Sequence, residues 1–132
     1  MISQTAEHAL RAVLYLAGNA DAGPLKVDEI ARALGAPRNY LSKTMHALAQ
    51  HGIVTSTRGP QGGFVLRVPP GELRLSRLVE LFDPPRRSGI CLLGGRPCTD
   101  ANPCRAHFRW KSIQETALGP MRDTTIADLL TD

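Results

Sequence analysis

The sequence predicts a mainly α-helical fold with one small β-hairpin. Two observations support this fold class, and the length of the chain limits the number of domains. Apolar residues recur at helical spacing in three segments between residues 2 and 51. Two β-rich runs follow, separated by a loop dense in glycine and proline. The length of 132 residues is enough for one ordinary domain, or for two small lobes that share a core.

The first two helices are expected at residues 2–18 and 26–35. In the first, one apolar stripe runs from Ile2 to Ala17, and Glu7 lies at its border, about 100° around the helix from the neighbouring apolar position. In the second, acidic residues occupy the first turn, where the helix dipole favours them. Gly35 is expected to cap its carboxyl end.

A third helix is expected at residues 37–51, with two different faces. The side chains predicted to point inward are Leu41, Met45 and Leu48. Another face carries Asn39, Lys43, His46 and Gln50. Two strands should follow at Ile53–Thr57 and Phe64–Val68, and the turn-forming residues between them predict a hairpin tip.

Two short helices joined by a turn around Gly35 and followed by a hairpin indicate a winged helix-turn-helix. The outer face of residues 37–51 is narrow, basic and polar, so it could enter a major groove and reach base edges or phosphates. The glycines of the hairpin tip would let the backbone approach closely, and Arg58 would suit a narrow minor groove.

The distribution of charge also points to a polyanionic partner. The net charge is +4, and residues 30–71 contain no acidic residue but several basic ones. A basic face that meets only solvent is the alternative interpretation. The chain shows no nucleophile motif and no phosphate-binding loop, so an enzyme is not expected.

The C-terminal part should contain a short helix over residues 76–82 and a longer helix over residues 105–118. The pair Gly119-Pro120 is expected to end or kink the longer helix, and Thr125 with Asp128 resembles a capping box. An apolar stripe on the longer helix is a candidate dimer surface, and it could also pack against the first helix of its own chain: Ala106, Trp110, Ile113 and Ala117. We expect one compact domain with a winged helix-turn-helix at residues 1–72 and a cysteine loop plus dimerisation helix at 73–132.

All three cysteines fall in one loop-like segment, with the spacing C-x6-C-x5-C and a histidine after two more residues: Cys91, Cys98, Cys104 and His107. The first residues lack the pattern of a signal peptide, and no apolar run approaches the ~18 residues of a membrane helix. A cytoplasmic protein is therefore expected, in which thiols stay reduced. The residues alone leave open an iron–sulfur cluster, a zinc site, a thiol redox switch or inert thiols.

Five segments, taken in order, resemble the Rrf-two class of winged-helix transcriptional regulators (IscR, NsrR and RirA types). They are TAEHALRAVLYLA, IARALGAPRNYLSKTMHAL, RGPQGGFVL, the cysteine loop ending CRAHFRW, and TTIADLL. The resemblance covers nearly the whole chain. The RGPQGG hairpin tip and the three-cysteine loop are its most specific parts.

The resemblance implies that Cys91, Cys98 and Cys104 ligate a 2Fe–2S or 4Fe–4S cluster, with zinc as the alternative metal. In some members the fourth ligand is a histidine that falls on His107. In others it is an acidic residue on the first helix of the other subunit, which falls on Glu7. His8 is a further candidate. The first cysteine spacing departs from members with a histidine ligand, which have x5 where this chain has x6.

The resemblance also implies DNA contacts at Arg38, Asn39, Tyr40, Ser42 and Lys43, and at Arg58, Gly59 and Gln61 of the hairpin tip. Tyr40 could equally pack inside. The function expected is that of a homodimeric repressor whose binding to a double-stranded operator depends on a cluster that senses redox state, nitric oxide or iron status. The alternatives are a zinc-stabilised DNA-binding protein and a cluster-free thiol sensor on the same fold.

Overall fold

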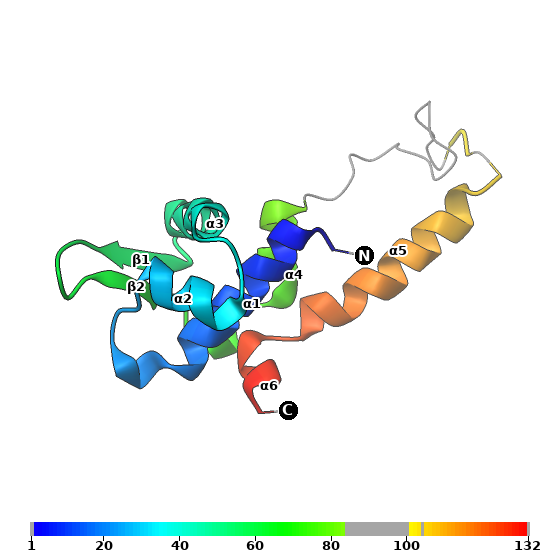
Figure 1. Cartoon of the computed structure of the whole chain (residues 1–132). Coiled ribbons are helices and arrows are strands. Elements are labelled where there is room, and N and C mark those ends of the chain that lie inside the picture. Colours follow the sequence, from blue (N-terminus) through cyan, green and yellow to red (C-terminus); the bar gives the residue numbers. More distant parts are fainter. Residues whose placement is uncertain (1, 84–100, 104, 132) are drawn as a thin grey trace.

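Helices dominate the described residues of this computed structural model, which are 2–83, 101–103 and 105–131. The element order is α1 (Gln4–Gly18), α2 (Val27–Leu34), α3 (Arg38–Gln50), β1 (Val54–Thr57), β2 (Gly63–Leu66), α4 (Leu75–Phe82), α5 (His107–Asp123) and α6 (Ile126–Leu130). Short 3-10 turns lie at Ala20–Ala22 and Pro70–Glu72. Figure 1 shows α1 to α4 gathered around one core, with the hairpin projecting from one side and α5 extending away from another.

Local capping explains where the first helices begin and end. The Ser3 side chain accepts a hydrogen bond from the Ala6 N–H at 3.1 Å, which satisfies one of the unpaired donors at the start of α1. Gly35 follows α2 in the left-handed region, with φ of 67°, as the sequence predicts for a helix cap. Its turn leads directly into α3, so the helix-turn-helix prediction is confirmed.

The hairpin is shorter than predicted and is anchored to the body of the protein. Strands β1 and β2 pair antiparallel, from Val54 opposite Leu66 to Thr57 opposite Gly63. A further pair of hydrogen bonds joins the start of β2 to the segment before α2: the Leu25 N–H donates to the Phe64 carbonyl at 3.0 Å, and the Phe64 N–H donates to the Leu25 carbonyl at 2.7 Å. This bridge fixes the wing relative to the helix-turn-helix.

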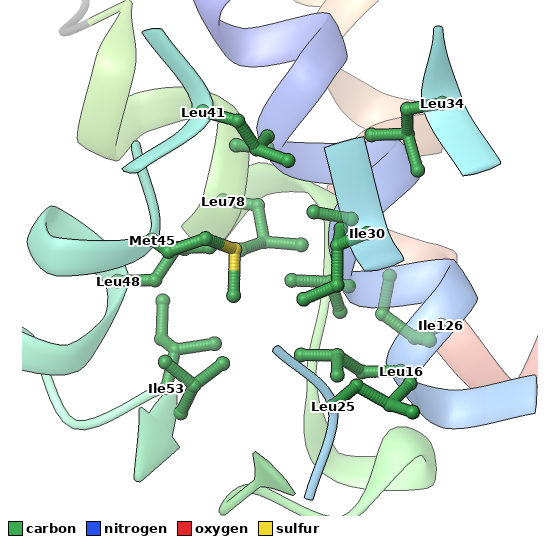
Figure 2. Packing of buried hydrophobic residues seen from close by; sticks show 14 of the residues in the cluster. Leu16, Leu25, Ile30, Leu34, Leu41, Met45, Leu48, Ile53, Leu78 and Ile126 are labelled. Atoms are coloured by element: carbon green, nitrogen blue, oxygen red, sulfur yellow. The ribbon is translucent and has the colours of Figure 1, made fainter. Parts of the chain in front are cut away.

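One apolar cluster joins elements from both parts of the sequence. Figure 2 shows α3 contributing Leu41, Met45 and Leu48, which face Ile30 of α2. The C-terminal part contributes three residues with less than 2% of their surface exposed: Leu73, Leu78 and Ile126. Burial of a leucine- or isoleucine-sized side chain stabilises the fold by about 1.5–3 kcal/mol, so α4 and α6 contribute to the same core as α2 and α3.

Of the two outcomes predicted at Gly119-Pro120, an end or a kink of the helix, the end is wrong, because α5 continues through this pair to Asp123. A proline inside a helix removes a single donor, the N–H that would bond to the carbonyl four residues earlier. The next turn still closes here, with the Thr124 N–H donating to the Pro120 carbonyl at 3.0 Å. The predicted capping box of Thr125 and Asp128 is confirmed at the start of α6.

Two features complete the description of the fold: the return of the chain after α5 and the character of the helices. Arg74 and Thr125 lie opposite each other in a short antiparallel bridge, in which the Leu75 N–H donates to the Thr124 carbonyl and the Ile126 N–H donates to the Leu73 carbonyl. This bridge and the packing of α6 on α1 return the chain to the body of the protein after α5. Across the described ranges, none of the helices combines the length and the apolar character that crossing a membrane would require.

Candidate DNA-reading surface and the segment beside the cysteines

Helix α3 presents a polar face to solvent because its opposite face is buried. Leu41, Met45 and Leu48 are fully buried, and the predicted outer residues are all exposed: Asn39, Lys43, His46 and Gln50. Of the DNA-contacting residues predicted in α3, Arg38, Asn39 and Lys43 are exposed, whereas Tyr40 and Ser42 are half-buried. The exposed set combines a lysine, an arginine and an amide, side chains suited to phosphates and base edges.

Arg38, the first residue of α3, forms an ion pair with Asp28 in the first turn of α2. The Arg38 Nε donates to the Asp28 Oδ1, and both side chains are more than half exposed. An exposed pair of this kind contributes only ~0–1 kcal/mol to stability. The ion pair should have a larger effect on affinity for DNA, because the Asp28 carboxylate neutralises the Arg38 cation that would otherwise face a phosphate.

We expect Asp28→Asn to tighten binding to any DNA duplex and to steepen its salt dependence. Release of Arg38 adds about one phosphate contact, which changes the slope of log K against log salt by about 0.9. Glu29→Gln is the matched control, since Glu29 is the next residue, also acidic and exposed. Fluorescence anisotropy over a salt series measures both slopes. Equal slopes for the two variants would show that the ion pair does not restrain Arg38.

The wing tip is a tight turn that exposes its polar groups. Arg58, Gly59 and Gln61 are all exposed. The Gly62 N–H donates to the Gly59 carbonyl at 3.0 Å, and Gly59 has φ of 103°, a value that favours glycine. A side chain at Gly62 would meet the Thr57 carbonyl oxygen at 2.2 Å. The glycines of the tip therefore fold the turn closely enough to present Arg58 at its edge.

The candidate cluster ligands Cys91, Cys98 and Cys104 lie outside the described residues. The described residues stop at Asp83 before them, and they also include 101–103 and 105–131. Asp83, which follows α4, accepts a hydrogen bond at its Oδ2 from the Ser3 N–H at 2.6 Å. The chain therefore leaves α4 beside the beginning of α1, the helix that carries Glu7. On the other side, His107 is the first residue of α5.

The three non-cysteine candidates occupy different environments. Glu7 is exposed in the first turn of α1. His107 is half-buried, and its ring meets that of Phe108 edge-on at 5.0 Å between centroids. His8 is buried with 8% of its surface exposed, and its ring meets Tyr40 edge-on. Within the described ranges, no three histidine, cysteine, aspartate or glutamate side chains gather closely enough to hold a metal ion.

The chemistry of the complete donor set fits an iron–sulfur cluster. Three thiolates with one imidazole or carboxylate are ligands that iron in such clusters accepts. The same set fits zinc as Cys₃His, although zinc sites usually include one closely spaced cysteine pair and this chain has none. Glu7 lies in the first turn of α1, whereas His107 is the first residue of α5. Figure 1 shows that the first turns of α5 form the end of that helix that lies away from α1.

Asp28 and Thr5 contact α3, and neither contact is predicted from the sequence. Asp28 is 10 residues from Arg38, and the first-turn position of an acidic residue is already explained by the helix dipole. Thr5 is 35 residues from Tyr40, to which its hydroxyl is hydrogen-bonded. The basic residue Arg38 at the start of α3 was the available signal for its contact with Asp28. No local signal indicated the contact between Thr5 and Tyr40.

Comparison with known proteins agrees with this arrangement. The family model "Rrf2: Iron-dependent Transcriptional regulator" matches residues 2–132. An Aquifex aeolicus protein assigned to the HTH-type transcriptional regulators is 37% identical over 132 residues, which cover 98% of this chain and 91% of that protein. The HTH-type transcriptional regulator IscR of Citrobacter koseri is 26% identical over 129 residues, covering 98% of this chain and 78% of IscR.

Solved structures share the fold over nearly the whole chain. CymR, described as the global cysteine regulator of B. subtilis, superposes with a TM-score of 0.82 at 22% identity, covering 99% of this chain and 96% of CymR. IscR of T. potens gives a TM-score of 0.80 at 23% identity, covering 100% of this chain and 87% of that structure. With the family model matching all but the first residue, the chain belongs to the Rrf2 family of DNA-binding, winged-helix transcriptional regulators.

Proposed function

We propose that this regulator is a cytoplasmic homodimeric repressor, not an enzyme, whose affinity for its operator is set by an iron–sulfur cluster. The observation that carries the proposal is the concentration of all three cysteines in one segment that leaves α4 beside α1 and enters α5. A reduced compartment gives such a segment no use as a disulfide framework, and thiolates are the main ligands of clusters.

The DNA-binding half of the proposal is supported by exposure and charge. Asn39 and Lys43 on α3 and Arg58 on the wing are exposed, and both elements pack against the core through other residues. We propose that α3 enters the major groove and that Arg58 reaches the adjacent minor groove. Tyr40 and Ser42 are half-buried, so we assign the main polar contacts to their exposed neighbours.

The dimer is supported by apolar surface on α5. Ile113, on the predicted stripe, has 56% of its surface exposed, and Phe108, about 140° around the helix from it, has 57%. Ala106, another residue of the predicted stripe, is half-buried. The side chains of the remaining two, Trp110 and Ala117, lie outside the described residues. Pairing of two such helices would bury this surface and would place two recognition helices about one helical repeat apart, ~34 Å.

The cluster would be held by Cys91, Cys98 and Cys104, with Glu7 of the partner subunit or His107 as the fourth ligand. When bound, it supplies an iron centre that reacts with oxidants and nitric oxide. The protein would link the cysteine segment to α1 and α5. Ordering of that segment by the cluster would then change the distance between the α3 helices of the two subunits. Alternative forms of the same fold would hold zinc or carry only reactive thiols.

Native mass spectrometry of protein purified without oxygen tests this proposal. We expect a dimer whose mass exceeds that of two chains by two clusters of iron and sulfide, together with visible absorbance. A dimer that carries only zinc would show instead that the protein is stabilised by zinc. A dimer without any added mass that loses free thiols after peroxide treatment would show instead that it is a thiol sensor.

A further inference from the structure

Two residues of α1 on either side of Glu7 contact the same residue of the recognition helix. The Thr5 Oγ1 and the Tyr40 hydroxyl are hydrogen-bonded. The His8 ring meets the Tyr40 ring edge-on, with centroids 5.3 Å apart and planes at 75°. Because residues 5 and 8 are three apart on a helix, they share one face. One face of α1 therefore contacts Tyr40 both at its hydroxyl and at its ring.

Tyr40 lies in the first turn of α3, among the residues predicted to contact DNA. Asn39 before it is exposed, Leu41 after it is fully buried, and Tyr40 itself is half-buried. Its carbonyl accepts a hydrogen bond from the Thr44 hydroxyl at 3.3 Å. Its hydroxyl, the group that could have contacted DNA, is engaged by α1. The side chain therefore connects two helices and is not free to extend into a groove.

His8 has an environment that packing alone does not explain. Only 8% of its surface is exposed, and its Nδ1 is buried with no hydrogen-bond partner among the described residues. A buried polar atom without a partner is unfavourable, and an apolar side chain at this place would avoid that cost. The ring is held instead against Tyr40, which suggests that the contact between α1 and α3 has a role besides stability.

The start of α1 is also the place where the cysteine segment meets the body of the protein. The Ser3 N–H donates to Asp83, the last described residue before that segment, and Glu7 lies one turn further along α1. A shift at either point displaces the turn that carries Thr5 and His8. Hydrogen bonds weaken steeply when their geometry is changed, so such a shift would alter the grip on Tyr40.

We propose that Tyr40 is a positioning residue that transmits the state of α1 to the DNA-reading end of α3, through its contacts with Thr5 and His8. This inference rests on the proposed function, in that the cluster would set the position of α1. It assigns to Tyr40 an effect on operator affinity that is exerted through Arg38 and Asn39, its neighbours on α3, and not by its own contact with DNA.

The test compares Thr5→Val, which keeps the shape but removes the hydroxyl, with Thr5→Ser, which keeps the hydroxyl. Tyr40→Phe and the double variant Thr5→Val with Tyr40→Phe complete the set. The probe is a duplex enriched from a random-sequence pool by the wild-type protein. Its affinity is measured by anisotropy for cluster-loaded and cluster-free protein, and thermal unfolding checks that each variant folds.

We expect Thr5→Val and Tyr40→Phe each to reduce the affinity ratio between the two states by about fivefold or more, which is the lower end of common coupling. The double variant should show no further loss, and Thr5→Ser should resemble the wild type. The inference is overturned if Thr5→Val behaves as wild type while Tyr40→Phe weakens binding equally in both states, since Tyr40 would then contact DNA directly.

Failure of the proposed function gives a different pattern. If the wild-type protein holds no cluster, only one state exists. The role of the contact between Thr5 and Tyr40 is then judged from the affinity of each variant for the duplex in that single state. Equal, non-additive losses for Thr5→Val and Tyr40→Phe then still support the positioning role. Additive losses, or a silent Thr5→Val, overturn it.

Discussion

Replacing Gly63 by alanine should weaken operator binding about tenfold or more, equivalent to about 1.4 kcal/mol, without altering any side chain proposed to contact DNA. Gly63 has φ of 149°, and a Cβ there would lie 2.6 Å from the Leu25 carbonyl oxygen. Since the neighbouring bonds between Leu25 and Phe64 anchor the wing, the substitution should detach it and misplace Arg58. Anisotropy with an operator duplex measures the loss.

Gly71→Ala provides the matched control for this prediction. A Cβ at Gly71 would meet nothing within 4 Å, and its φ is not positive. Its affinity should equal that of the wild type, and circular dichroism should show native helix content for both variants. Operator affinity of the Gly63 variant within about twofold of wild type would mean that the wing contributes little to binding.

Replacing Cys98 by alanine should abolish visible absorbance and change operator affinity by about 5–150-fold, the usual range of coupling between two sites. The physical reason is that loss of one thiolate leaves the cluster with too few ligands to persist. Absorption spectra and operator titrations on the same anaerobic preparation provide both readouts.

Thr99→Ala is the control, because it alters the neighbouring residue and leaves all three thiols in place. It should keep both the absorbance and the affinity of the wild type. If Cys98→Ala binds the operator as the wild type does, the cysteine segment has no part in regulation, whatever metal it holds.

Elements governed by local physics were predicted well from the sequence. The periodic apolar residues of α1 to α3 and the cap at Gly35 depend on neighbours within a few positions, so their pattern predicts them. The same holds for the division of α3 into a buried face with Leu41 and an exposed face with Lys43. The candidate wing tip also follows from local turn chemistry, because glycine is required where φ is positive.

Contacts between distant segments could not be predicted in this way. The pairing of Leu25 with Phe64 joins a loop to a strand 39 positions later, and only the packed fold brings them together. The grip of Thr5 and His8 on Tyr40 depends on how two helices cross. The helix end expected at Pro120 failed for another reason: loss of one hydrogen bond is not enough to end a helix whose next turn still closes.

The most direct test of cluster control is the operator affinity of a single wild-type preparation, measured without oxygen before and after a chelator removes the cluster. Using one preparation avoids any effect of substitution on folding. We expect the operator affinity to change by about fivefold or more when the cluster is removed, and to return when the cluster is rebuilt with iron and sulfide. Equal affinities before and after removal would contradict cluster control.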